Sequence, residues 1–308
     1  MHLPYVLMPQ QEHPVPLDAA YVPLNDRSFL FGDSLYEVMT TYQGKPFFVD
    51  DHLERLFNSA AGVYMDLPLD RQGFKDLIYK GLNFYKGPDE VYIRLMISRG
   101  VSDFNIDTRS NTEPARVYVL FKTAPRYGGR YAETGFHLAV PSTRRNAPLS
   151  LNPAYKTGNY LNNVLCLHEA KALGADDALI LDLNDYVTEA STSNFFIIKN
   201  GVLMTAPVEL GVLGGITRQH LIEVARNLGM PVAETAFTLE DVYASEERFV
   251  SSSLKGAMPV YRVNDHQFTP GYGPLTHRLN TAYWEHVARH VQSGDYPSKP
   301  SHLFRLGA

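Results

Sequence analysis

One lysine stands in the stretch PAYKTGNYLNN, residues 153–163, among small, aromatic and amide side chains. None of its sequence neighbours is acidic, so the sequence predicts no ion pair for Lys156 within this stretch. Apolar residues then follow at helical spacing, which predicts a helix closed by Gly174. Lys156 is therefore either a solvated loop lysine or an amine held for covalent chemistry. The inner face of the helix would consist of Leu161, Val164, Leu165, His168 and Ala172.

Other stretches contain groups that bind anions or carry charge. The glycine pair in GVLGGITRQHL precedes a helix with Thr217 in its first turn, and a helix N-terminus can hold a phosphate. Glu189 ends a strand in YVTEASTSNFF, FVSSS ends in three serines, and Arg55 lies on the helix DDHLERLFNSA. Taken singly, each feature has a simpler explanation. The glycine pair would be a turn, Glu189 a surface acid, the serines a turn and Arg55 a surface arginine.

Together, these groups favour a cofactor site. A lysine amine, a carboxylate, an arginine and two anion-binding turns are the parts needed to hold pyridoxal phosphate. The lysine bonds to the aldehyde, the acid keeps the pyridine nitrogen protonated, and the turns bind the phosphate.

The composition excludes several classes of protein. The chain has 308 residues, with 28 Lys and Arg against 33 Asp and Glu, a net charge of −5. This mildly acidic balance argues against a nucleic-acid binder. No secretory signal and no stretch of ~18–20 apolar residues is present. The single cysteine, Cys166, excludes an internal disulfide and should be a packed thiol. We expect a soluble, cytoplasmic protein without a metal site.

The periodicity predicts an α+β fold in two domains. Strands are expected at 34–42, 90–100, 115–121 and 248–253, with hairpins at Asn184-Asp185 and Asn200-Gly201. Helices are expected at 74–85, from Ile216 to Gly229 and over 275–292. The tail from residue 293 reads as a loop.

One further helix should follow FFVDD. Asp51 and Glu54 have the spacing of a capping box. Its apolar face would consist of Leu53, Leu56, Phe57, Ala60 and Tyr64.

Glycines, a proline and charges replace the apolar pattern after residue 122. We expect a small N-terminal domain at 1–122, a linker at 123–134 and a large cofactor-binding domain at 135–308.

The order of the motifs resembles a known family. FGDSLYEV…GKPFFVDDHLERL, NPAYKTGNYLNNVL, ALILDLNDYVTEASTSNFFIIKNGVLMTAP, GVLGGITRQHL and RFVSSSLKGAMPV span about residues 29–262. They are similar to the fold-type IV (class IV) pyridoxal-phosphate aminotransferases, which include branched-chain and D-amino acid aminotransferases and aminodeoxychorismate lyases. The resemblance implies a small N-terminal α/β domain and a larger domain with a mixed, barrel-like sheet.

Matching the motifs assigns roles by resemblance. Lys156 is similar to the Schiff-base lysine and would also move the proton between the substrate Cα and the cofactor C4′. Glu189 corresponds to the acid at the pyridine nitrogen, and Arg55 to the phosphate-binding arginine. Tyr160 resembles the tyrosine at the phenolic oxygen, although branched-chain enzymes space it one residue further from the lysine. The remaining cofactor-binding residues would be Thr192, Ile216, Thr217, Ser252 and Ser253.

The subgroup is less clear from the motifs. Tyr92 and Arg94 fit the Tyr-x-Arg strand of branched-chain aminotransferases, and VSDFNID lacks the Arg-x-His carboxylate trap of D-amino acid enzymes. LYEVMTTY nevertheless resembles the D-amino acid enzymes, with Tyr36 at their substrate-carboxylate tyrosine. SSSLKGAMPV partly resembles the lyases, but Val38 replaces their threonine. Lys255 is unexpected, and should bind a second acidic group or pair on the surface. The substrate contacts would be Tyr36, Tyr92, Arg94, Leu254 and Lys255, with Phe31 and Tyr160 as further aromatic lining.

The leading interpretation is transamination between a branched-chain or other L-amino acid and a 2-oxo acid. The alternatives are D-amino acid or (R)-amine transamination, an aminodeoxychorismate lyase, and a non-catalytic binding relative. The resemblance also implies a homodimer in which the loop 101–113 closes the partner's site.

Overall fold

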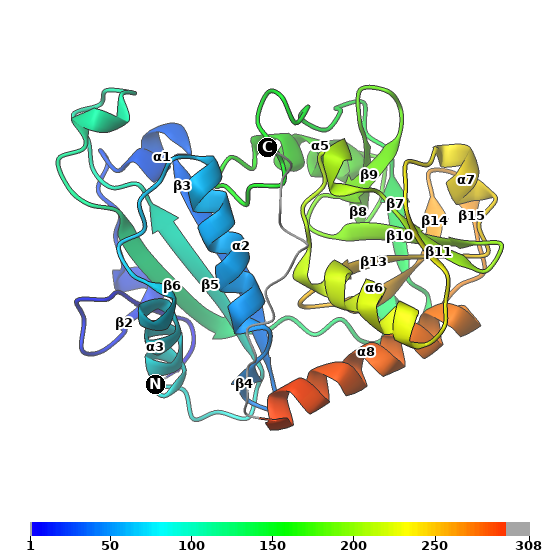
Figure 1. Cartoon of the computed structure of the whole chain (residues 1–308), viewed down its shortest axis with the longest axis horizontal. Coiled ribbons are helices and arrows are strands. Elements are labelled where there is room, and N and C mark those ends of the chain that lie inside the picture. The colour runs from blue at the N-terminus through cyan, green and yellow to red at the C-terminus, as the bar shows by residue number, and fades with distance from the viewer. Residues whose placement is uncertain (1, 294–308) are drawn as a thin grey trace. The chain divides into compact units, whose positions relative to one another are not determined.

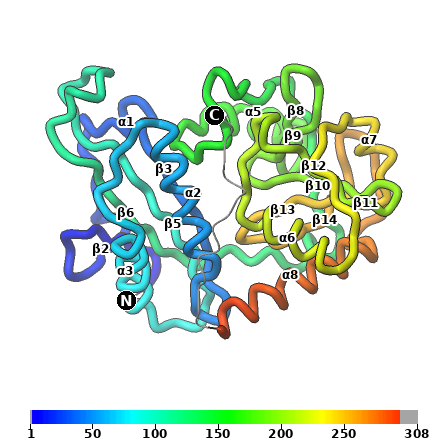
Figure 2. The backbone as a smooth tube through the Cα atoms, in the orientation of Figure 1, coloured from blue at the N-terminus to red at the C-terminus, as the bar shows by residue number. Residues whose placement is uncertain are grey.

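The computed structural model describes residues 2–293, and its internal contacts divide the chain into two compact units. Among the described residues, unit 1 comprises 2–125, 155–159 and 290–293. Unit 2 comprises Arg126–Ala154 and Tyr160–Arg289 (Figures 1 and 2). The domain limits expected from the sequence remain a prediction.

Unit 1 is built on an antiparallel sheet in the order β2-β1-β6-β5-β3-β4. The strands expected at 34–42, 90–100 and 115–121 are confirmed as β3, β5 and β6. The bounds are β1 Tyr5–Leu7, β2 Val15–Pro16, β3 Ser34–Tyr42, β4 Lys45–Pro46, β5 Val91–Ser98 and β6 Arg116–Thr123.

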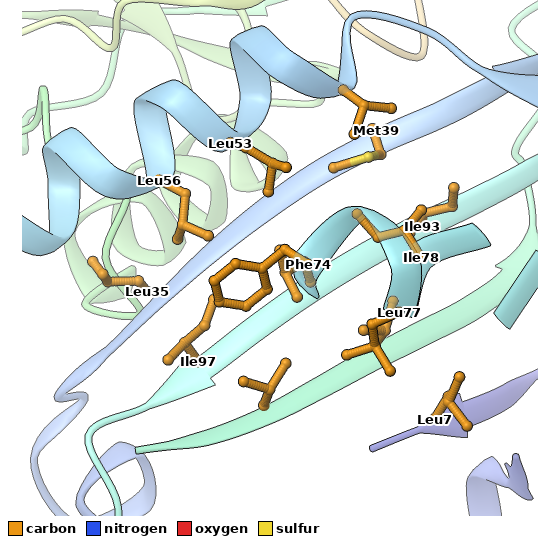
Figure 3. Packing of buried hydrophobic residues seen from close by; sticks show 14 of the residues in the cluster. Leu7, Leu35, Met39, Leu53, Leu56, Phe74, Leu77, Ile78, Ile93 and Ile97 are labelled. Atoms are coloured by element: carbon orange, nitrogen blue, oxygen red, sulfur yellow. The ribbon is translucent and has the colours of Figure 1, made fainter. Parts of the chain in front are cut away.

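Two long helices cover one face of this sheet. Leu53 and Leu56 of α2 and Phe74 of α3 pack against Leu35 and Met39 of β3 in one apolar cluster (Figure 3). Because side chains alternate along a strand, the residues between them on β3 and β5 point to the opposite face. The helical elements are η1 Leu17–Ala19, α1 Arg27–Phe31, α2 Val49–Gly62, α3 Arg71–Leu82 and η2 Thr108–Ser110.

The start of α2 differs from the prediction. Its N-cap is Phe48, in a left-handed conformation without a side-chain cap, so the capping box expected at Asp51 and Glu54 is wrong. Both residues already lie inside the helix. Tyr64, expected on the apolar face, follows the helix and is 91% exposed.

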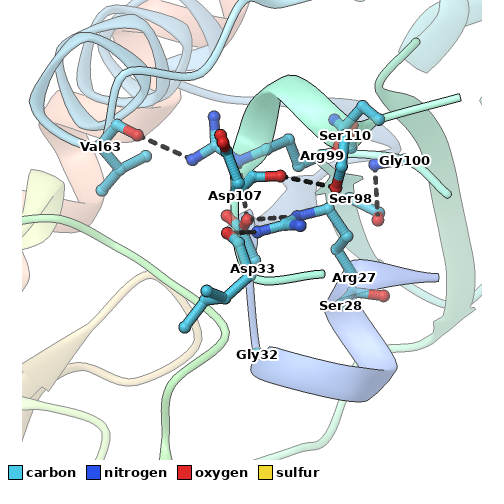
Figure 4. Close-up of polar contacts among 12 residues, drawn as sticks. Arg27, Ser28, Gly32, Asp33, Val63, Ser98, Arg99, Gly100, Asp107 and Ser110 are labelled. Atoms are coloured by element: carbon cyan, nitrogen blue, oxygen red, sulfur yellow. Dashed lines mark hydrogen bonds and ion pairs between the residues drawn. The ribbon is translucent and has the colours of Figure 1, made fainter. Parts of the chain in front are cut away.

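Arg27 holds the loop that follows β5, and it shares the carboxylate of Asp33 with Arg99. Asp33 Oδ2 accepts hydrogen bonds from Arg27 Nε at 2.9 Å and Arg99 Nε at 2.7 Å (Figure 4). The other Arg27 nitrogens donate to the carbonyls of Asn105 and Ile106. The loop is irregular apart from η2, as expected, and it is anchored by buried charge rather than by apolar packing.

Unit 2 contains a closed, mixed barrel. Strands β10-β13-β14-β7-β8-β9 follow one another, and a β9–β10 pairing closes the ring. Only the β14–β7 and β7–β8 pairs within the ring are parallel. The expected mixed, barrel-like sheet is confirmed. The bounds are β7 Phe136–Ala139, β8 Asp177–Leu181, β9 Val187–Ala190, β10 Asn194–Lys199, β13 Glu247–Ser252 and β14 Gly256–Val263.

Turn residues and helix ends in unit 2 follow the sequence closely. Asn200 and Gly201 both have positive φ, which a two-residue hairpin requires, and this hairpin and the one at Asn184-Asp185 are confirmed. The helices expected from Ile216 and over 275–292 are α6 and α8. The remaining bounds are β11 Val202–Thr205, β12 Val232–Glu234, β15 His266–Gln267, α4 Arg130–Glu133, α5 Leu161–Ala172, η3 Val208–Leu210, α6 Ile216–Asn227, α7 Leu239–Tyr243 and α8 Pro274–Ser293.

Helix α5 is turned the opposite way from the expectation. Its buried face consists of Asn163, Cys166 and Ala170, which confirms Cys166 as a packed thiol. The five residues expected on the inner face are all exposed, with Leu161 at 69% and Val164 at 56%. Their spacing identifies one face of the helix correctly, but that face is not packed against a core within residues 2–293.

The tail from residue 294, expected to be a loop, lies outside the described residues. Within residues 2–293, no helix combines the length and the apolarity that crossing a bilayer requires.

Candidate active site

Lys156 is fixed by the backbone of unit 1. The short segment Tyr155–Asn159 pairs with β3, because Tyr36 N donates to Lys156 O at 3.0 Å and Gly158 N donates to Ser34 O at 2.8 Å. Lys156 N also donates to Ser59 Oγ of α2 at 3.2 Å. Five residues that are distant in sequence from β3 thus act as an added strand and hold the lysine in one place.

Tyr36 lies between two cationic side chains. Lys156 Nζ donates to Tyr36 Oη at 3.3 Å and lies 4.3 Å from the ring centroid. Arg94 Cζ lies 4.0 Å from the same centroid. Val38 pairs directly with Arg94 across β3 and β5, so Tyr36 is its diagonal neighbour on the sheet face away from α2. The structure therefore brings together three of the residues expected to contact substrate or cofactor.

Tyr92 lies on the same sheet face, two residues before Arg94. It is 9% exposed, and Lys122 Nζ lies 4.5 Å from its ring centroid. Phe31 ends α1 and is partly exposed.

Arg55 is not the surface arginine that its helix alone suggests. It is 5% exposed and makes a two-pronged ion pair with Glu37, through Nε at 2.8 Å and Nη2 at 2.6 Å. His52 Nδ1 lies 2.8 Å from the same carboxylate. Burial opposes ionisation of Glu37, but the charge and hydrogen bonds of Arg55 and His52 outweigh it and lower its pKa to about 2.

Burial lowers the pKa of His52, which favours the neutral ring. Since an ionised carboxylate only accepts, we assign the proton on Nδ1 as the one donated to Glu37. Glu37 and His52 thus fix the guanidinium of Arg55.

Glu189, on β9 of unit 2, is also buried and held. Arg145 Nη2 donates to its Oε1 at 2.6 Å. Asn194 Nδ2 at 3.0 Å and Leu213 N at 3.1 Å both donate to its Oε2. Glu189 is 5% exposed, so the reading as a surface acid is wrong. Three donors therefore orient this one carboxylate.

The N-terminus of α6 lies against this group. The helix begins at Ile216 without a side-chain cap, which leaves its first backbone N–H groups without intrahelical acceptors. Gly215 packs so closely that an added Cβ would come 2.0 Å from Asn194 Oδ1. Thr217 is buried, and its Oγ1 lies 3.4 Å from Tyr283 Oη. An uncapped helix N-terminus is suited to hold an anion, and the phosphate site expected here remains a prediction.

Two turns at the barrel end carry the remaining candidates. Thr192 is exposed in the turn between β9 and β10. Ser252 ends β13, and Ser253 and Leu254 form the turn before β14. Lys255 is 5% exposed and donates to Ser193 Oγ at 2.8 Å, so the expected surface pairing is wrong. Tyr160 is the N-cap residue of α5 and is partly exposed.

Sequence reasoning missed the residues that hold the candidate acid and arginine. Arg145 appears in TRRNAPLSLNPAYK, where nothing distinguishes it from its surface neighbour Arg144. Glu37 and His52 likewise carry no local signal. A buried charge must be paired, so each could be found only once its partner was known to be buried.

Comparison with known proteins decides the family. The model for amino-transferase class IV matches residues 34–263, well over half of the chain. The chain belongs to the class IV aminotransferases. It is therefore a pyridoxal-phosphate-dependent enzyme that transfers amino groups, as the motifs indicate.

The relatives of this class IV aminotransferase carry two different substrate names. A Methanocaldococcus jannaschii protein, provisionally named a branched-chain-amino-acid aminotransferase, is 36% identical over 80% of this chain and 83% of its own. The D-alanine aminotransferase of Listeria monocytogenes is 32% identical over 90% and 94%.

Solved structures agree on the fold. The branched-chain aminotransferase of Thermoproteus uzoniensis with norvaline has a TM-score of 0.86 at 27% identity, covering 94% of this chain and 96% of that one. The branched-chain amino acid aminotransferase of Escherichia coli has a TM-score of 0.83 at 28% identity, covering 92% and 94%.

Each unit by itself carries side chains of the kinds that pyridoxal phosphate needs. Unit 1 supplies a backbone-fixed amine at Lys156 and a clamped arginine at Arg55. Unit 2 supplies an oriented carboxylate at Glu189 and the open terminus of α6, where no Cβ fits at Gly215. An amine, an acid and phosphate-binding groups are the set that pyridoxal phosphate needs.

Proposed function

We propose that this class IV aminotransferase moves the amino group of branched-chain, or more broadly apolar, L-amino acids to a 2-oxo acid. The observation that carries the proposal is the guanidinium of Arg94 stacked on Tyr36, whose hydroxyl accepts a hydrogen bond from Lys156. A guanidinium binds carboxylates with two parallel hydrogen bonds, so Arg94 is suited to hold an acid beside the reacting amine. The relative from M. jannaschii and the norvaline complex from T. uzoniensis support the same class.

The site residues take the following roles in this proposal. Lys156 would bond to the aldehyde of the cofactor, and its Nζ would then accept and return the proton of the substrate Cα as base and acid. Glu189 would accept a hydrogen bond from the pyridine nitrogen of the cofactor, and Tyr160 would donate one to its phenolic oxygen. When bound, pyridoxal phosphate supplies the aldehyde and an electron-withdrawing ring. The phosphate would be held by Arg55, Thr192, Ile216, Thr217, Ser252 and Ser253.

Substrate would contact unit 1 mainly through Tyr36, Tyr92 and Arg94. The aromatic rings offer an apolar surface to the side chain, and Arg94 offers the charge for a carboxylate. Leu254 and Phe31 would add to the apolar lining. Lys255 is not assigned a direct contact, because its amine is buried against Ser193.

D-amino acids are the second candidate. The Listeria relative named D-alanine aminotransferase covers nearly the whole chain, and Tyr36 lies beside Lys156, where the motif resemblance puts a carboxylate-binding tyrosine. Against it, the loop 101–113 contains one arginine, Arg109, which pairs with Asp107 on the surface.

A homodimer belongs to the same proposal. The exposed apolar stripe of α5 and the exposed side chains of Phe104 and Ile106 on the 101–113 loop support it, since a second copy would cover apolar surface. Light scattering that gives a monomer mass would contradict it. The domain limits at 1–122, 123–134 and 135–308 and the cytoplasmic location also remain predictions from the sequence.

Lys156→Ala tests the assigned lysine, with the exposed Lys171→Ala as control. We expect the wild type and Lys171→Ala to purify yellow, and borohydride to attach the cofactor to residue 156. Turnover of Lys156→Ala should fall by at least about a hundredfold, because it loses both the covalent anchor and the acid–base group. Unchanged turnover would show that another lysine reacts.

Half-reactions then separate the substrate classes. The rate at which the absorption of the bound cofactor changes is measured with L-leucine, D-alanine and (R)-phenylethylamine. We expect L-leucine to react fastest. Faster reaction with D-alanine would overturn the L-amino acid proposal without affecting the family.

A further inference from the structure

The turn Ser191–Ser193 joins the strand that carries Glu189 to the strand that begins with Asn194. Its middle residue, Thr192, is exposed, whereas Ser191 is 3% and Ser193 is 5% exposed. Asn194 itself donates to Glu189. A displacement of this short turn would therefore move both the carboxylate and one of its donors.

Two buried charged residues hold the turn from its two ends. Asp177 Oδ1, at the start of β8, accepts hydrogen bonds from the backbone N and the hydroxyl of Ser191. Lys255 Nζ donates to the hydroxyl of Ser193 at 2.8 Å. Asp177 and Lys255 are each 5% exposed. No ion pair joins them directly in the part of the chain that the structure describes, so the two serines lie between opposite charges.

The surroundings of Lys255 suit an amine that holds Ser193. Its amine lies 5.0 Å from the ring centroid of Phe136 and 5.3 Å from that of Tyr127, which favours a cation. Burial lowers the pKa of Lys255, and the charge of Asp177 acts against that lowering. A lysine this buried would be costly to keep without a specific role for its amine.

Lys255 also belongs to a second turn. It precedes β14, and its backbone N donates to Ser252 O at 3.0 Å. The side chain thus connects the turn of Ser253 and Leu254 with the turn of Thr192, at one end of the barrel. Both turns carry residues proposed to contact the cofactor.

We infer that Lys255 is a positioning residue, which locks the 191–193 turn to the 253–255 turn and thereby orients the carboxylate of Glu189. This inference rests on the role proposed for Glu189. It explains why a lysine occurs where the family motif does not lead one to expect it. Displacing the turn would break this hydrogen bond and leave a buried amine and a buried hydroxyl unsatisfied, so the bond resists the displacement.

Ser193→Ala removes only the acceptor, and Lys255→Met removes the amine while keeping the apolar stem. Ser193→Thr restores a hydroxyl. Lys199→Met is the matched control, because Lys199 ends the same strand β10 and pairs with Asp241 in a partly exposed position. The measurements are amide exchange of residues 190–196 in the cofactor-free protein, kcat and KM, and the pH at which the visible band of the bound cofactor changes.

In Ser193→Ala and Lys255→Met we expect faster amide exchange and a kcat about tenfold lower, since leaving a buried polar group without its hydrogen-bond partner costs about that factor. The pH at which the visible band changes should rise by about one unit. This pH reports the protonation of the nitrogen that joins Lys156 to the cofactor, and that nitrogen holds its proton more tightly when the pyridine ring is less protonated. Ser193→Thr should recover most of kcat, and Lys199→Met should resemble the wild type.

The inference is overturned if Ser193→Ala matches the wild type in exchange, kcat and spectral pH. Loss of stability alone, with an unchanged spectral pH and kcat, would also overturn it and leave Lys255 a structural residue. A colourless wild type without transaminase activity would instead refute the proposed function. The two failures are therefore distinguishable.

Discussion

Replacing Glu37 by glutamine tests the buried charge cluster that holds Arg55. The change keeps the size of the side chain but removes the charge that faces both Arg55 nitrogens, at 2.8 and 2.6 Å. Glu37 is fully buried and Arg55 nearly so. Breaking such a pair leaves an uncompensated buried cation, which costs about 3–5 kcal/mol.

The lowered pKa of Glu37 gives a similar estimate of the stability that the ion pair contributes. A decrease from 4.5 to about 2 is a difference of about 2.5 units, or about 3 kcal/mol at about 1.4 kcal/mol per unit. Because the folded state lowers the pKa of Glu37, its contribution is complete above pH 4.5 and is lost as the pH falls from 4.5 toward 2. The stability difference between wild type and Glu37→Gln should therefore shrink from about pH 5 to about pH 3.

Urea unfolding followed by circular dichroism measures this difference at each pH, and amide exchange of β3 and α2 localises it to unit 1. Glu113→Gln is the control, because Glu113 pairs with Arg116 at the surface, with side chains 48% and 30% exposed. It should cost less than about 1 kcal/mol. The reasoning would be refuted if Glu37→Gln lost as little stability as the control, or if its loss of stability did not change with pH.

Two further changes test the surroundings of Glu189. Arg145→Met removes the charged donor of Glu189, and we expect urea unfolding to show that the folded state loses about 3–5 kcal/mol of stability. The control is Arg144→Met, which breaks a surface pair with Asp185 and should cost less than about 1 kcal/mol. Equal losses of stability in the two variants would contradict the buried pair. Gly215→Ala places a Cβ 2.0 Å from Asn194 Oδ1, and overpacking of this kind costs about 1–3 kcal/mol. We therefore expect the affinity for pyridoxal phosphate to fall about tenfold or more. An absorbance titration measures this affinity. Gly128→Ala, where a Cβ meets nothing within 4 Å, is its control, and an unchanged affinity in Gly215→Ala would show that the α6 terminus can move aside.

Local patterns in the sequence were sufficient for much of the fold. The strand-like residues of SLYEVMTTY predicted β3 at its observed bounds, and Asn200-Gly201 predicted a hairpin because both residues tolerate positive φ. The ordered motifs also identified the family and its cofactor, since a motif records which side chains a chemistry needs. These signals depend on residues close together in the chain.

The direction in which helix faces point was decided only by the tertiary structure. The stripe from Leu161 to Ala172 was recognised correctly as one face of a helix, but α5 packs its small opposite face, with Cys166 and Ala170, against the barrel. Periodicity shows which side chains share a face and does not show what that face meets.

The sequence by itself was sufficient to name the candidate residues for transamination: an amine at 156, an acid at 189 and an arginine at 55. Only the tertiary structure decided how they are held, because Arg145 is 44 residues from Glu189, Glu37 is 18 from Arg55 and Lys255 is 62 from Ser193. These groups lose their hydration only when the chain folds, and a buried polar or charged group then needs a partner that compensates for the lost water. Which residue becomes that partner depends on the tertiary structure.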